Sequence, residues 1–302
     1  MTELYKSLEK LVRGELKINA PMAEYCTLGV GGKADLLFIP KDINDLATAL
    51  RRVPTEIPIT IIGGGSNILV RDGGLSGLTI LTTKMQNNIK IKDTYISADA
   101  GVSSVLISNI AANHGISGFE FMCGLPGTIG GAVCGNAECF GGETSKVIES
   151  VDVIDRKGNL IHMKNNELGF RYRGSNFPPN CVMITVNMHG VAASPDAIRK
   201  KMAENKAARA ARQTIPVGMR TCGCLFKNPE GDTAGRLIDA AGWRGRMVNG
   251  SGMSPGHANY LVTFGTASAT DLESLAHKIQ KEVFEKFGIK LELELKILGN
   301  LP

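Results

Sequence analysis

The chain has 302 residues, with 36 glycines, seven cysteines, 43% apolar residues and a formal net charge of +5. Its glycine content exceeds the average of roughly 7%, but no Gly-X-Y period accompanies it, which excludes collagen, and the apolar content excludes a disordered chain. Because a typical domain holds roughly 100–150 residues, this length predicts two or three domains that bury a large core.

The N-terminus carries leucines and a valine at helical spacing rather than an export signal. Leu4, Leu8, Leu11, Val12 and Leu16 predict one amphipathic helix. The longest uncharged glycine-rich stretch, residues 121–137, is broken by glycines and a proline, so we expect a loop there and no membrane span. The cysteines are odd in number and lack zinc-ligand spacing, which favours free thiols, a reducing cytoplasm and no metal site.

Short apolar runs and helical stretches alternate along the first two thirds of the chain. Residues 34–40 and 57–62 are predicted strands around a helix at 43–52, and two more strands, 68–70 and 78–81, flank the turn at 72–74. Further on, strands at 95–98, 151–154 and 183–186 accompany a helix at 104–113. Strands and helices without a regular βαβ repeat favour an α+β fold.

The last third begins with a helix-start signal at Ser194-Pro195, which predicts a helix over 195–212. A second helix is predicted over 270–287, with Thr270 and Glu273 as a capping box and Gly288 as the stop. Alternating apolar residues over 289–297 then predict a strand whose other face carries Glu292, Glu294 and Lys296.

Two glycine-rich turns are candidate anion sites. In the first, Gly63-Gly64-Gly65-Ser66-Asn67, consecutive N–H groups without side-chain cover can converge on a phosphate, although a purely structural turn explains the residues equally well. Ile68 occupies the last glycine position of a dinucleotide fingerprint, so that motif is not met. The second runs from Gly124 to Gly131 and leaves backbone amides and the Thr128 hydroxyl open to a ligand, unless it is only a tight loop. Two such loops favour a large ligand with a diphosphate.

Two other features need weighing. Residues 252–256 match the Gly-x-Ser-x-Gly nucleophile elbow, but Pro255 has no N–H for an oxyanion hole, which argues against a serine hydrolase. Between Asp196 and Arg220 stand seven basic residues against two acidic ones, a pattern typical of a solvated helix face or of a site for a small anionic substrate. Nucleic acid is the alternative partner, but no stacking motif, helix-turn-helix or zinc finger supports it.

Seven segments together resemble one family over almost the whole chain. They are TLGVGG from Thr27, IIGGGSNILVRDGG from Ile61, GLPGTIGGAVCGNA from Gly124, RYRGSNF from Arg171, CGCLFKNPEGDTAGRLIDAAG from Cys222, MSPGHANYLV from Met253 and LELELKILG from Leu291. In this order they resemble the bacterial UDP-N-acetylenolpyruvoylglucosamine reductases, flavoenzymes of peptidoglycan precursor synthesis. The short length and the absence of an extra tyrosine-bearing insertion resemble the compact second type of that family.

The resemblance implies a fold, cofactors and a reaction. The fold is a two-subdomain FAD-binding region of the vanillyl-alcohol-oxidase type over 1–83 and 84–193, followed by an α+β substrate-binding domain over 194–302. NADPH is the co-substrate, and UDP-N-acetylglucosamine enolpyruvate is reduced to UDP-N-acetylmuramate in the cytoplasm. The residues implied to contact FAD are Gly63, Gly64, Gly65, Ser66, Asn67, Gly124, Pro126, Gly127, Thr128, Gly130, Gly131 and Asn136.

The same resemblance implies three catalytic residues. Arg173 would polarise the substrate carboxylate, and Glu294 would assist the intermediate. The proton donor departs from the family, whose motif has serine where this chain has Cys224; a thiol, with a reference pKa near ~8.5, can serve as a general acid. Substrate contacts are expected from Tyr172, Lys227, Asn228 and His257, while Gly174, Leu293 and Thr214 depart from the family pattern beside the site.

Two other functions remain open from the residues. One is a different FAD oxidoreductase on the same fold, such as a sugar or lactone oxidase, although neither glycine turn contains the histidine that often links the flavin in such enzymes. The other is a basic nucleic-acid-binding protein, which only the net charge of +5 favours. The expected partners are the UDP-sugar substrate and NADPH, with no nucleic acid, no membrane insertion and no obligate protein partner.

Overall fold

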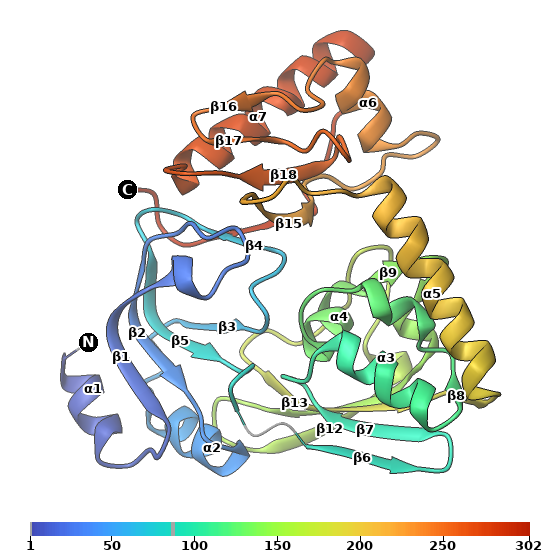
Figure 1. Ribbon diagram of the computed structural model, residues 1–302. Helices are drawn as coiled ribbons and strands as arrows, with labels where there is room; N and C mark the ends of the chain where they lie inside the picture. The colour runs from blue at the N-terminus through green and yellow to red at the C-terminus, as the bar shows by residue number, and fades with distance from the viewer. Residues whose placement is uncertain (1, 86–87) are drawn as a thin grey trace. The chain divides into compact units, whose positions relative to one another are not determined.

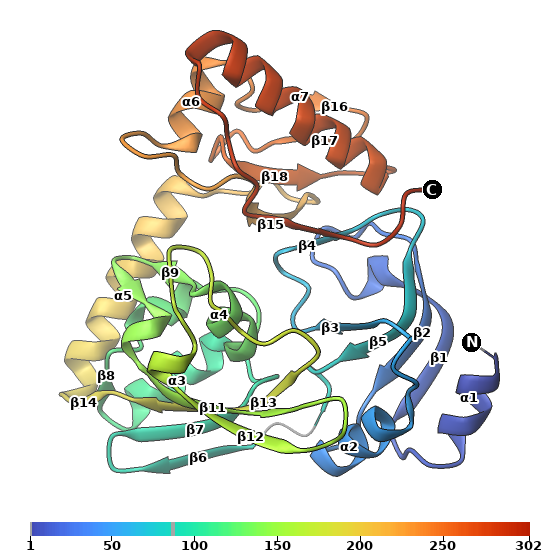
Figure 2. The same ribbon diagram turned by 180° about the vertical axis from the view of Figure 1, so that it is seen from behind.

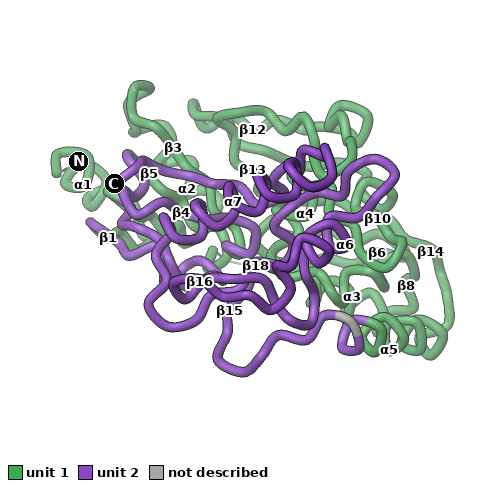
Figure 3. Tube along the Cα trace, turned by 90° about the horizontal axis from the view of Figure 1, so that it is seen from above, with its two compact units in different colours: residues 1–18, 35–64, 77–208 green, residues 19–34, 65–76, 209–302 purple. Residues whose placement is uncertain are grey.

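The computed structural model describes residues 2–85 and 88–302, and the chain passes repeatedly between two units. Unit 1 comprises residues 1–18, 35–64 and 77–208, and unit 2 comprises residues 19–34, 65–76 and 209–302 (Figure 3). Two segments of the first predicted subdomain, 19–34 and 65–76, therefore belong to the same unit as the C-terminal third. The predicted domain limits at 83 and 193 stay a proposal.

The first sheet has the strand order β1-β2-β5-β3, with β3 parallel to β5 (Figure 1). Its strands and accompanying helices are α1 (Thr2–Glu9), β1 (Glu15–Pro21), β2 (Lys33–Ile39), α2 (Ile43–Arg52), β3 (Ile59–Ile62) and β5 (Leu75–Leu81). The predicted strand-helix-strand pattern is confirmed, and α2 has the predicted limits. The helix begins there because the Asp42 side chain accepts the N–H of Asp45, and its Leu46 and Leu50 join Phe38 in a buried core.

The predicted N-terminal helix is too long, because α1 ends at Glu9 and Leu16 lies in β1. The buried carboxylate of Asp45 accepts the N–H groups of Arg13 at 2.7 Å and Gly14 at 2.8 Å. A Cβ on Gly14 would stand 2.2 Å from the carbonyl oxygen of Ile39. The chain therefore turns tightly here, which helical spacing of the leucines could not reveal.

The second sheet of unit 1 is antiparallel, with the order β12-β11-β13-β7-β6. Its strands are β6 (Ile89–Lys92), β7 (Tyr95–Asp99), β11 (Ile148–Ile154), β12 (Leu160–Lys164) and β13 (Val182–His189). Helices α3 (Ser104–Asn113) and α4 (Ile129–Gly135) lie over one face, as Figures 1 and 2 show from opposite sides. Helix α5 (Pro195–Arg212), with the predicted limits, buries Ile198 and Met202 against α3 and the η2 turn (Glu120–Gly124).

Residues 121–137 are not a continuous loop as predicted, since they contain the end of η2 and all of α4. Thr128 starts α4 by accepting the N–H of Gly131 at 3.2 Å. Gly130 allows the helix to approach strand β7's end closely, because a Cβ there would lie 2.9 Å from that of Ala100. Glycine in this helix permits packing that a larger residue would prevent.

Unit 2 has a four-stranded antiparallel sheet, β15-β18-β17-β16, with α6 and α7 on one face (Figures 1 and 2). Its elements are β4 (Ile68–Val70), β15 (Arg220–Cys224), α6 (Ala234–Ala240), β16 (Met247–Val248), β17 (Ser251–Met253), β18 (Tyr260–Thr263), α7 (Ala269–Phe287) and β19 (Lys296–Leu298). Trp243 is fully buried in its core. Ser254 is buried as well and donates to the carbonyl of Thr214 at 3.1 Å, so it is no exposed nucleophile. None of the described helices is long and apolar enough to cross a membrane.

Helix α7 has its capping box two residues earlier than predicted. Ser268 and Asp271 form it, while Thr270 and Glu273 contact the β4 turn instead: Thr270 donates to Asp72, and Glu273 pairs with Arg71 at 2.8 Å. Both candidate boxes have suitable residue types, and only the position of Asp72, far away in sequence, decides between them. The predicted stop is confirmed, since Gly288 adopts φ 70°.

Asp72→Ala should destabilise the protein. The Asp72 carboxylate accepts the N–H groups of Ala269 and Thr270 at 3.1 and 2.8 Å, two donors that the start of α7 leaves without helical acceptors. We expect a loss of about 0.5–2 kcal/mol in the free energy of unfolding, measured by urea titration at pH 7. Asp196→Ala is the control, because that side chain at the start of α5 is 95% exposed, and an equal loss would contradict the assignment.

The same contribution should depend on pH. Burial raises the pKa of Asp72, but the hydrogen bonds from Thr270 and Ala269 outweigh it and leave the pKa below its usual value. A depressed folded-state pKa means that the stabilisation is complete above the unfolded value of about 4 and is lost as pH falls through the folded value. The difference between Asp72→Ala and the parent chain should therefore shrink below about pH 4.

Candidate active site

A β-bulge sets the position of Cys224 in unit 2. The register between β15 and β18 shifts between Thr221 and Cys224, so two residues of β15 stand opposite one of β18. Gly223 takes φ 83° within this bulge, and its N–H donates to the Thr221 hydroxyl at 3.0 Å. Bulges re-aim side chains and are common beside active sites. Here the bulge leaves Cys224 half-buried at the end of the strand while Cys222 is buried.

The segment that carries Glu294 is extended but is not the continuous strand predicted over 289–297. Burial alternates as predicted, with Leu291 and Leu295 in the core, yet ladder pairing begins only at Lys296, where β19 joins β4. Leu293 makes an isolated bridge to Phe226. The segment thus changes partner, from residues after β15 to strand β4, and a residue pattern cannot show such an exchange.

Glu294 lies where this exchange takes place. Its N–H donates to the carbonyl of Leu225 at 2.9 Å, and its carbonyl accepts from the Asn67 side chain at 3.1 Å. Unit 2 therefore brings together residues 67, 224–225 and 294, the first and last of which are 227 positions apart in the sequence. Among the predicted site residues, Asn67, Cys224 and Glu294 form this cluster.

The neighbouring thiol shows how the environment separates the two cysteines. Burial first, and then the nearby Cys224 and Glu294, together raise the pKa of Cys222 to about 12. Cys222 is therefore a protonated packing residue of the core at neutral pH. Its pKa also indicates that Cys224 and Glu294 are both close enough to Cys222 to act on it electrostatically.

Asn259, which was not among the predicted site residues, holds the two residues that follow Cys224 in place. Its side chain accepts the N–H of Phe226 at 3.0 Å and donates to the carbonyl of Phe226 at 2.7 Å, and its own carbonyl accepts the N–H of Leu225 at 2.8 Å. The side chain is buried, as such a double contact requires. The only sequence signal for Asn259 was its position in the family-like segment MSPGHANYLV.

Three of the four predicted substrate contacts also lie in unit 2. The Lys227 ammonium pairs with exposed Glu292 at 3.3 Å, and Asn228 accepts the N–H of Ala234 at 3.1 Å, which fixes the approach to α6. His257 packs against the Tyr260 ring with centroids 4.3 Å apart. Burial, then the charges of Arg244 and Arg209, lower the pKa of His257, so its ring is neutral at pH 7.

Arg173 and Tyr172 lie in a tight turn of unit 1. Arg171 and Gly174 close the turn by reciprocal backbone hydrogen bonds of 3.0 and 3.1 Å, and Arg173 adopts φ 55°. The Arg173 guanidinium lies over the exposed Tyr172 ring, 5.4 Å from its centroid, and donates to the carbonyl of Glu138 at 3.4 Å. A non-glycine residue in this region is uncommon and worth a functional explanation.

Gly63 and Gly64 of the first glycine turn meet the second glycine turn within unit 1. A Cβ on Gly63 would stand 2.6 Å from the Thr128 hydroxyl oxygen, and one on Gly64 would stand 2.7 Å from the Cα of Gly127. Among the described residues, the N–H groups of Gly63 and Gly64 donate to no protein acceptor. Gly65 has a φ of 62°, and its carbonyl oxygen accepts the N–H of Thr27 with an N···O distance of 3.0 Å. The turns therefore need glycine for close packing, and the first one also has donors to offer a ligand.

Not all amides of the second turn are open as expected. The N–H of Gly130 donates to the carbonyl of Ala100 at 2.9 Å, and that of Gly131 donates to Thr128. Gly131 itself is exposed, and a Cβ on it would meet only the Thr128 hydroxyl oxygen at 3.4 Å. Since no packing demands glycine there, the bare surface at Gly131 suits a flat or bulky ligand that lies directly on the helix. Gly124 ends η2, and Pro126 is exposed between the two helices.

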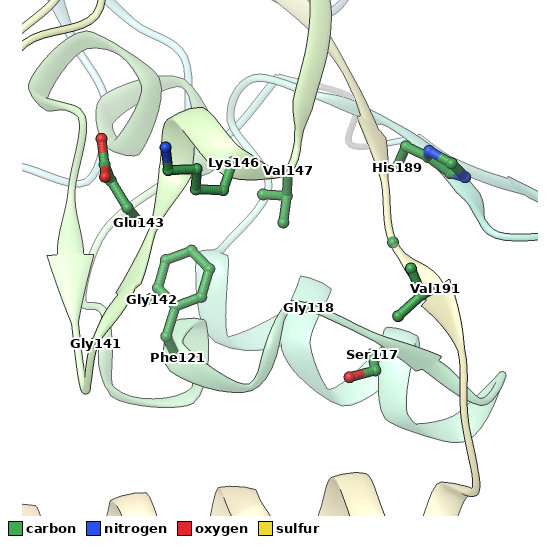
Figure 4. A pocket seen from close by; sticks show the side chains of 11 residues that line it. Ser117, Gly118, Phe121, Gly141, Gly142, Glu143, Lys146, Val147, His189 and Val191 are labelled. Carbon is green, nitrogen blue, oxygen red and sulfur yellow. The ribbon is translucent and has the colours of Figure 1, made fainter.

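A cavity of about 420 Å³ lies elsewhere in unit 1 (Figure 4). Its described lining includes Ser117, Phe121, Lys146 and His189 and none of the predicted site residues. The His189 ring is already engaged, because it stacks on Tyr95 with centroids 4.1 Å apart and bonds the Thr94 hydroxyl at 2.9 Å. We assign no ligand to this cavity.

Comparison with known proteins shows that the chain belongs to a class of FAD-binding proteins. Residues 34–164 match the family model of an FAD-binding domain. The solved 6-hydroxy-D-nicotine oxidase of Arthrobacter nicotinovorans, 14% identical, superposes with a TM-score of 0.59 over 94% of this chain and 89% of that one, which shows likeness of fold alone. The α+β fold with a two-subdomain FAD-binding region of the vanillyl-alcohol-oxidase type is confirmed, and the chain is an FAD-dependent oxidoreductase.

The remaining matches identify the family. Residues 215–298 match the C-terminal domain of UDP-N-acetylenolpyruvoylglucosamine reductase. The reductase of that name from Paramagnetospirillum magneticum is 40% identical over 288 residues, 95% of this chain and 93% of its own. The crystal structure of the Thermus caldophilus reductase, 33% identical, superposes with a TM-score of 0.80 over 95% of this chain and 99% of that one. The chain belongs to the UDP-N-acetylenolpyruvoylglucosamine reductase family.

Proposed function

We propose that the chain reduces UDP-N-acetylglucosamine enolpyruvate to UDP-N-acetylmuramate, with FAD as the bound cofactor and NADPH as the electron source, in the cytoplasm. The observation that carries the proposal is the cluster of Cys224, Glu294 and Asn67 in unit 2, in a chain of this family. The seven cysteines, none of which is in a disulfide, support a reducing compartment.

The two glycine turns are the proposed FAD contacts. Gly63 and Gly64 offer backbone donors, and Gly131 offers a surface without a side chain beside Thr128. Such N–H groups suit a diphosphate, because they bring partial positive charge without bulk. The FAD held there would, once reduced by NADPH, be the source of the hydride that C3 of the enolpyruvyl group accepts.

The remaining steps fall to side chains of this chain. As hydride reaches C3, negative charge develops on C2 and the adjacent carboxylate, where the planar Arg173 guanidinium can hold it by paired hydrogen bonds. The Cys224 thiol then donates a proton to C2, so that one hydride and one proton together saturate the double bond. Glu294 is proposed to assist at the same intermediate from the extended segment that precedes β19. Tyr172, Lys227 and His257 stay proposed substrate contacts.

Gly131→Ala tests the FAD assignment. Alanine favours a helix over glycine by about 1 kcal/mol, and the added methyl meets no tight contact, so the FAD-free protein should be as stable as the parent or more stable. We expect FAD binding, followed by flavin absorbance during titration, to weaken at least about tenfold, a cost of ~1.4 kcal/mol for one steric clash. Gly135→Ala in the same helix also meets open space, and it should bind FAD normally. Equal binding by both variants would contradict the assignment.

The function itself is tested by two measurements on the purified chain. Its flavin absorbance should bleach on anaerobic addition of NADPH and return on addition of the enolpyruvyl substrate, with UDP-N-acetylmuramate as product. A flavoprotein that instead consumes oxygen with a free sugar, and ignores the enolpyruvyl substrate, would be an oxidase and would defeat the proposal.

A further inference from the structure

Asn136 connects three segments around the Arg173 turn. It follows α4 as its C-cap in the left-handed conformation, with φ 41° and ψ 57°, and its surface is only 3% exposed. Its Nδ2 donates to Oε1 of Glu143 at 2.7 Å and to the carbonyl of Arg171 at 3.1 Å, and its Oδ1 accepts the N–H of Ser145 at 3.0 Å. One buried amide therefore joins the end of α4, the β9–β10 hairpin (Glu138–Glu143) and the Arg173 turn.

These bonds leave the Asn136 side chain no donor for a ligand. A primary amide has two N–H donors, and both are used within the protein. We propose that Asn136, oriented by Glu143, is a positioning residue that docks the Arg171–Gly174 turn and so directs the Arg173 guanidinium, rather than a donor to FAD. The inference rests on the proposed role of Arg173.

The turn needs such external support because its conformation is costly. Left-handed backbone at a residue such as Arg173 costs about 1–3 kcal/mol and persists only where the surroundings impose it. Three anchors of the turn and of the residue after it come from residues 134–138: the carbonyl of Cys134 accepts from Ser175 at 3.1 Å, Asn136 donates to Arg171, and the carbonyl of Glu138 accepts from Arg173. Cys134 and Glu138 contribute backbone carbonyls, whereas Asn136 contributes its side chain, so a substitution at Asn136 can remove this anchor directly.

Glu143 fixes which way the Asn136 amide faces. Its carboxylate accepts the Ser145 hydroxyl at 2.5 Å as well as the Asn136 Nδ2, and these two hydrogen bonds lower its pKa. An ionised carboxylate only accepts, so the amide must turn its NH₂ group toward it. Figure 4 shows Glu143 on β10 with its carboxylate directed away from the Phe121 ring.

Asn136→Asp is the informative variant, because it keeps the shape and tolerates the left-handed conformation but removes both donors. We expect the reoxidation of reduced flavin by the enolpyruvyl substrate to slow at least about tenfold, while flavin reduction by NADPH stays within about twofold. Hydrogen exchange of the 170–177 segment should accelerate in the FAD-free protein, a readout that needs no activity. Asn136→Gly, which retains the left-handed cap, should show the same pattern if the aspartate variant folds poorly.

Two further variants separate positioning from general structure. Asn165 also bridges two carbonyls with its Nδ2, those of Ser145 at 2.9 Å and Ile148 at 2.8 Å, and both carbonyls lie outside the Arg171–Gly174 turn. Asn165→Asp should lower the melting temperature without separating the two half-reactions. Adding Glu143→Gln to Asn136→Asp supplies an N–H donor between the two side chains and should recover part of the lost rate, a coupling that independent sites do not show.

Clear outcomes overturn the inference. If Asn136→Asp weakens FAD binding, slows both half-reactions alike and leaves exchange at 170–177 unchanged, Asn136 contacts the cofactor instead. Parent-like behaviour in every measurement would overturn it as well. If the parent chain ignores the enolpyruvyl substrate, the proposed function fails on its own, while the exchange comparison still decides whether Asn136 holds the turn.

Discussion

Cys224→Ala should leave the chain able to accept electrons but nearly unable to finish the reaction. Flavin reduction by NADPH should be unchanged, whereas turnover of the enolpyruvyl substrate should fall about 10²–10⁴-fold, the usual loss on removing a general acid. Rapid-mixing absorbance of the flavin separates the two half-reactions. Retention of fast substrate turnover would rule out Cys224 as the proton donor.

Cys222→Ala is the matched control for that experiment. Cys222 directly precedes the bulge glycine, Gly223, but it lies in the core of unit 2, where burial raises its pKa to about 12. Its removal should cost stability and leave both half-reactions alone. Cys224→Ser, which restores the residue usual in the family, should keep turnover above that of the alanine variant.

The same two thiols should differ in reactivity. Only thiolates react with iodoacetamide, and Cys222 is both buried and protonated at neutral pH. Cys224 is half-buried at the end of β15, so of these two thiols alkylation located by mass spectrometry should fall on Cys224, and it should slow turnover. Bound substrate should protect it.

Elements with strong local signals were predictable from the sequence. Helices α2, α3 and α5 have the predicted limits, because the signals that define them, such as the Asp42 cap of α2, lie within or next to each segment. The errors arose where a distant residue decides: Asp45 stops α1, and Asp72 occupies Thr270 so that Ser268 caps α7. No window of sequence contains both partners of such contacts.

The candidate site follows the same division. Motif order identified Cys224, Glu294 and the glycine turns, but no residue pattern foretold that Asn67 would bond the backbone of Glu294. The accessible amides expected at Gly130 and Gly131 are partly used within the protein, because α4 begins there and its first turn packs on Ala100. Donor availability depends on tertiary neighbours, which spacing alone does not encode.

Glu294 and Glu292 offer the sharpest paired test of the catalytic proposal. The two residues alternate along one extended segment and share its outward face, so sequence alone assigns them similar surroundings. The structure separates them: Glu292 has a side chain 73% exposed and pairs with Lys227, whereas Glu294 is half-buried and has its backbone held by Leu225 and Asn67. A carboxylate carried on a backbone held in this way needs less reorganisation as charge develops in the reaction.

Glu294→Gln keeps the shape of the side chain but removes its charge and its basicity. We expect kcat to fall about 10²–10⁴-fold with little change in KM, since the lost interaction belongs to the transition state. Glu292→Gln should stay within about threefold, because an exposed ion pair contributes only ~0–1 kcal/mol. Steady-state kinetics with the enolpyruvyl substrate measure both. Equal losses would show that the segment's position matters rather than the Glu294 carboxylate, and two small losses would remove Glu294 from the reaction.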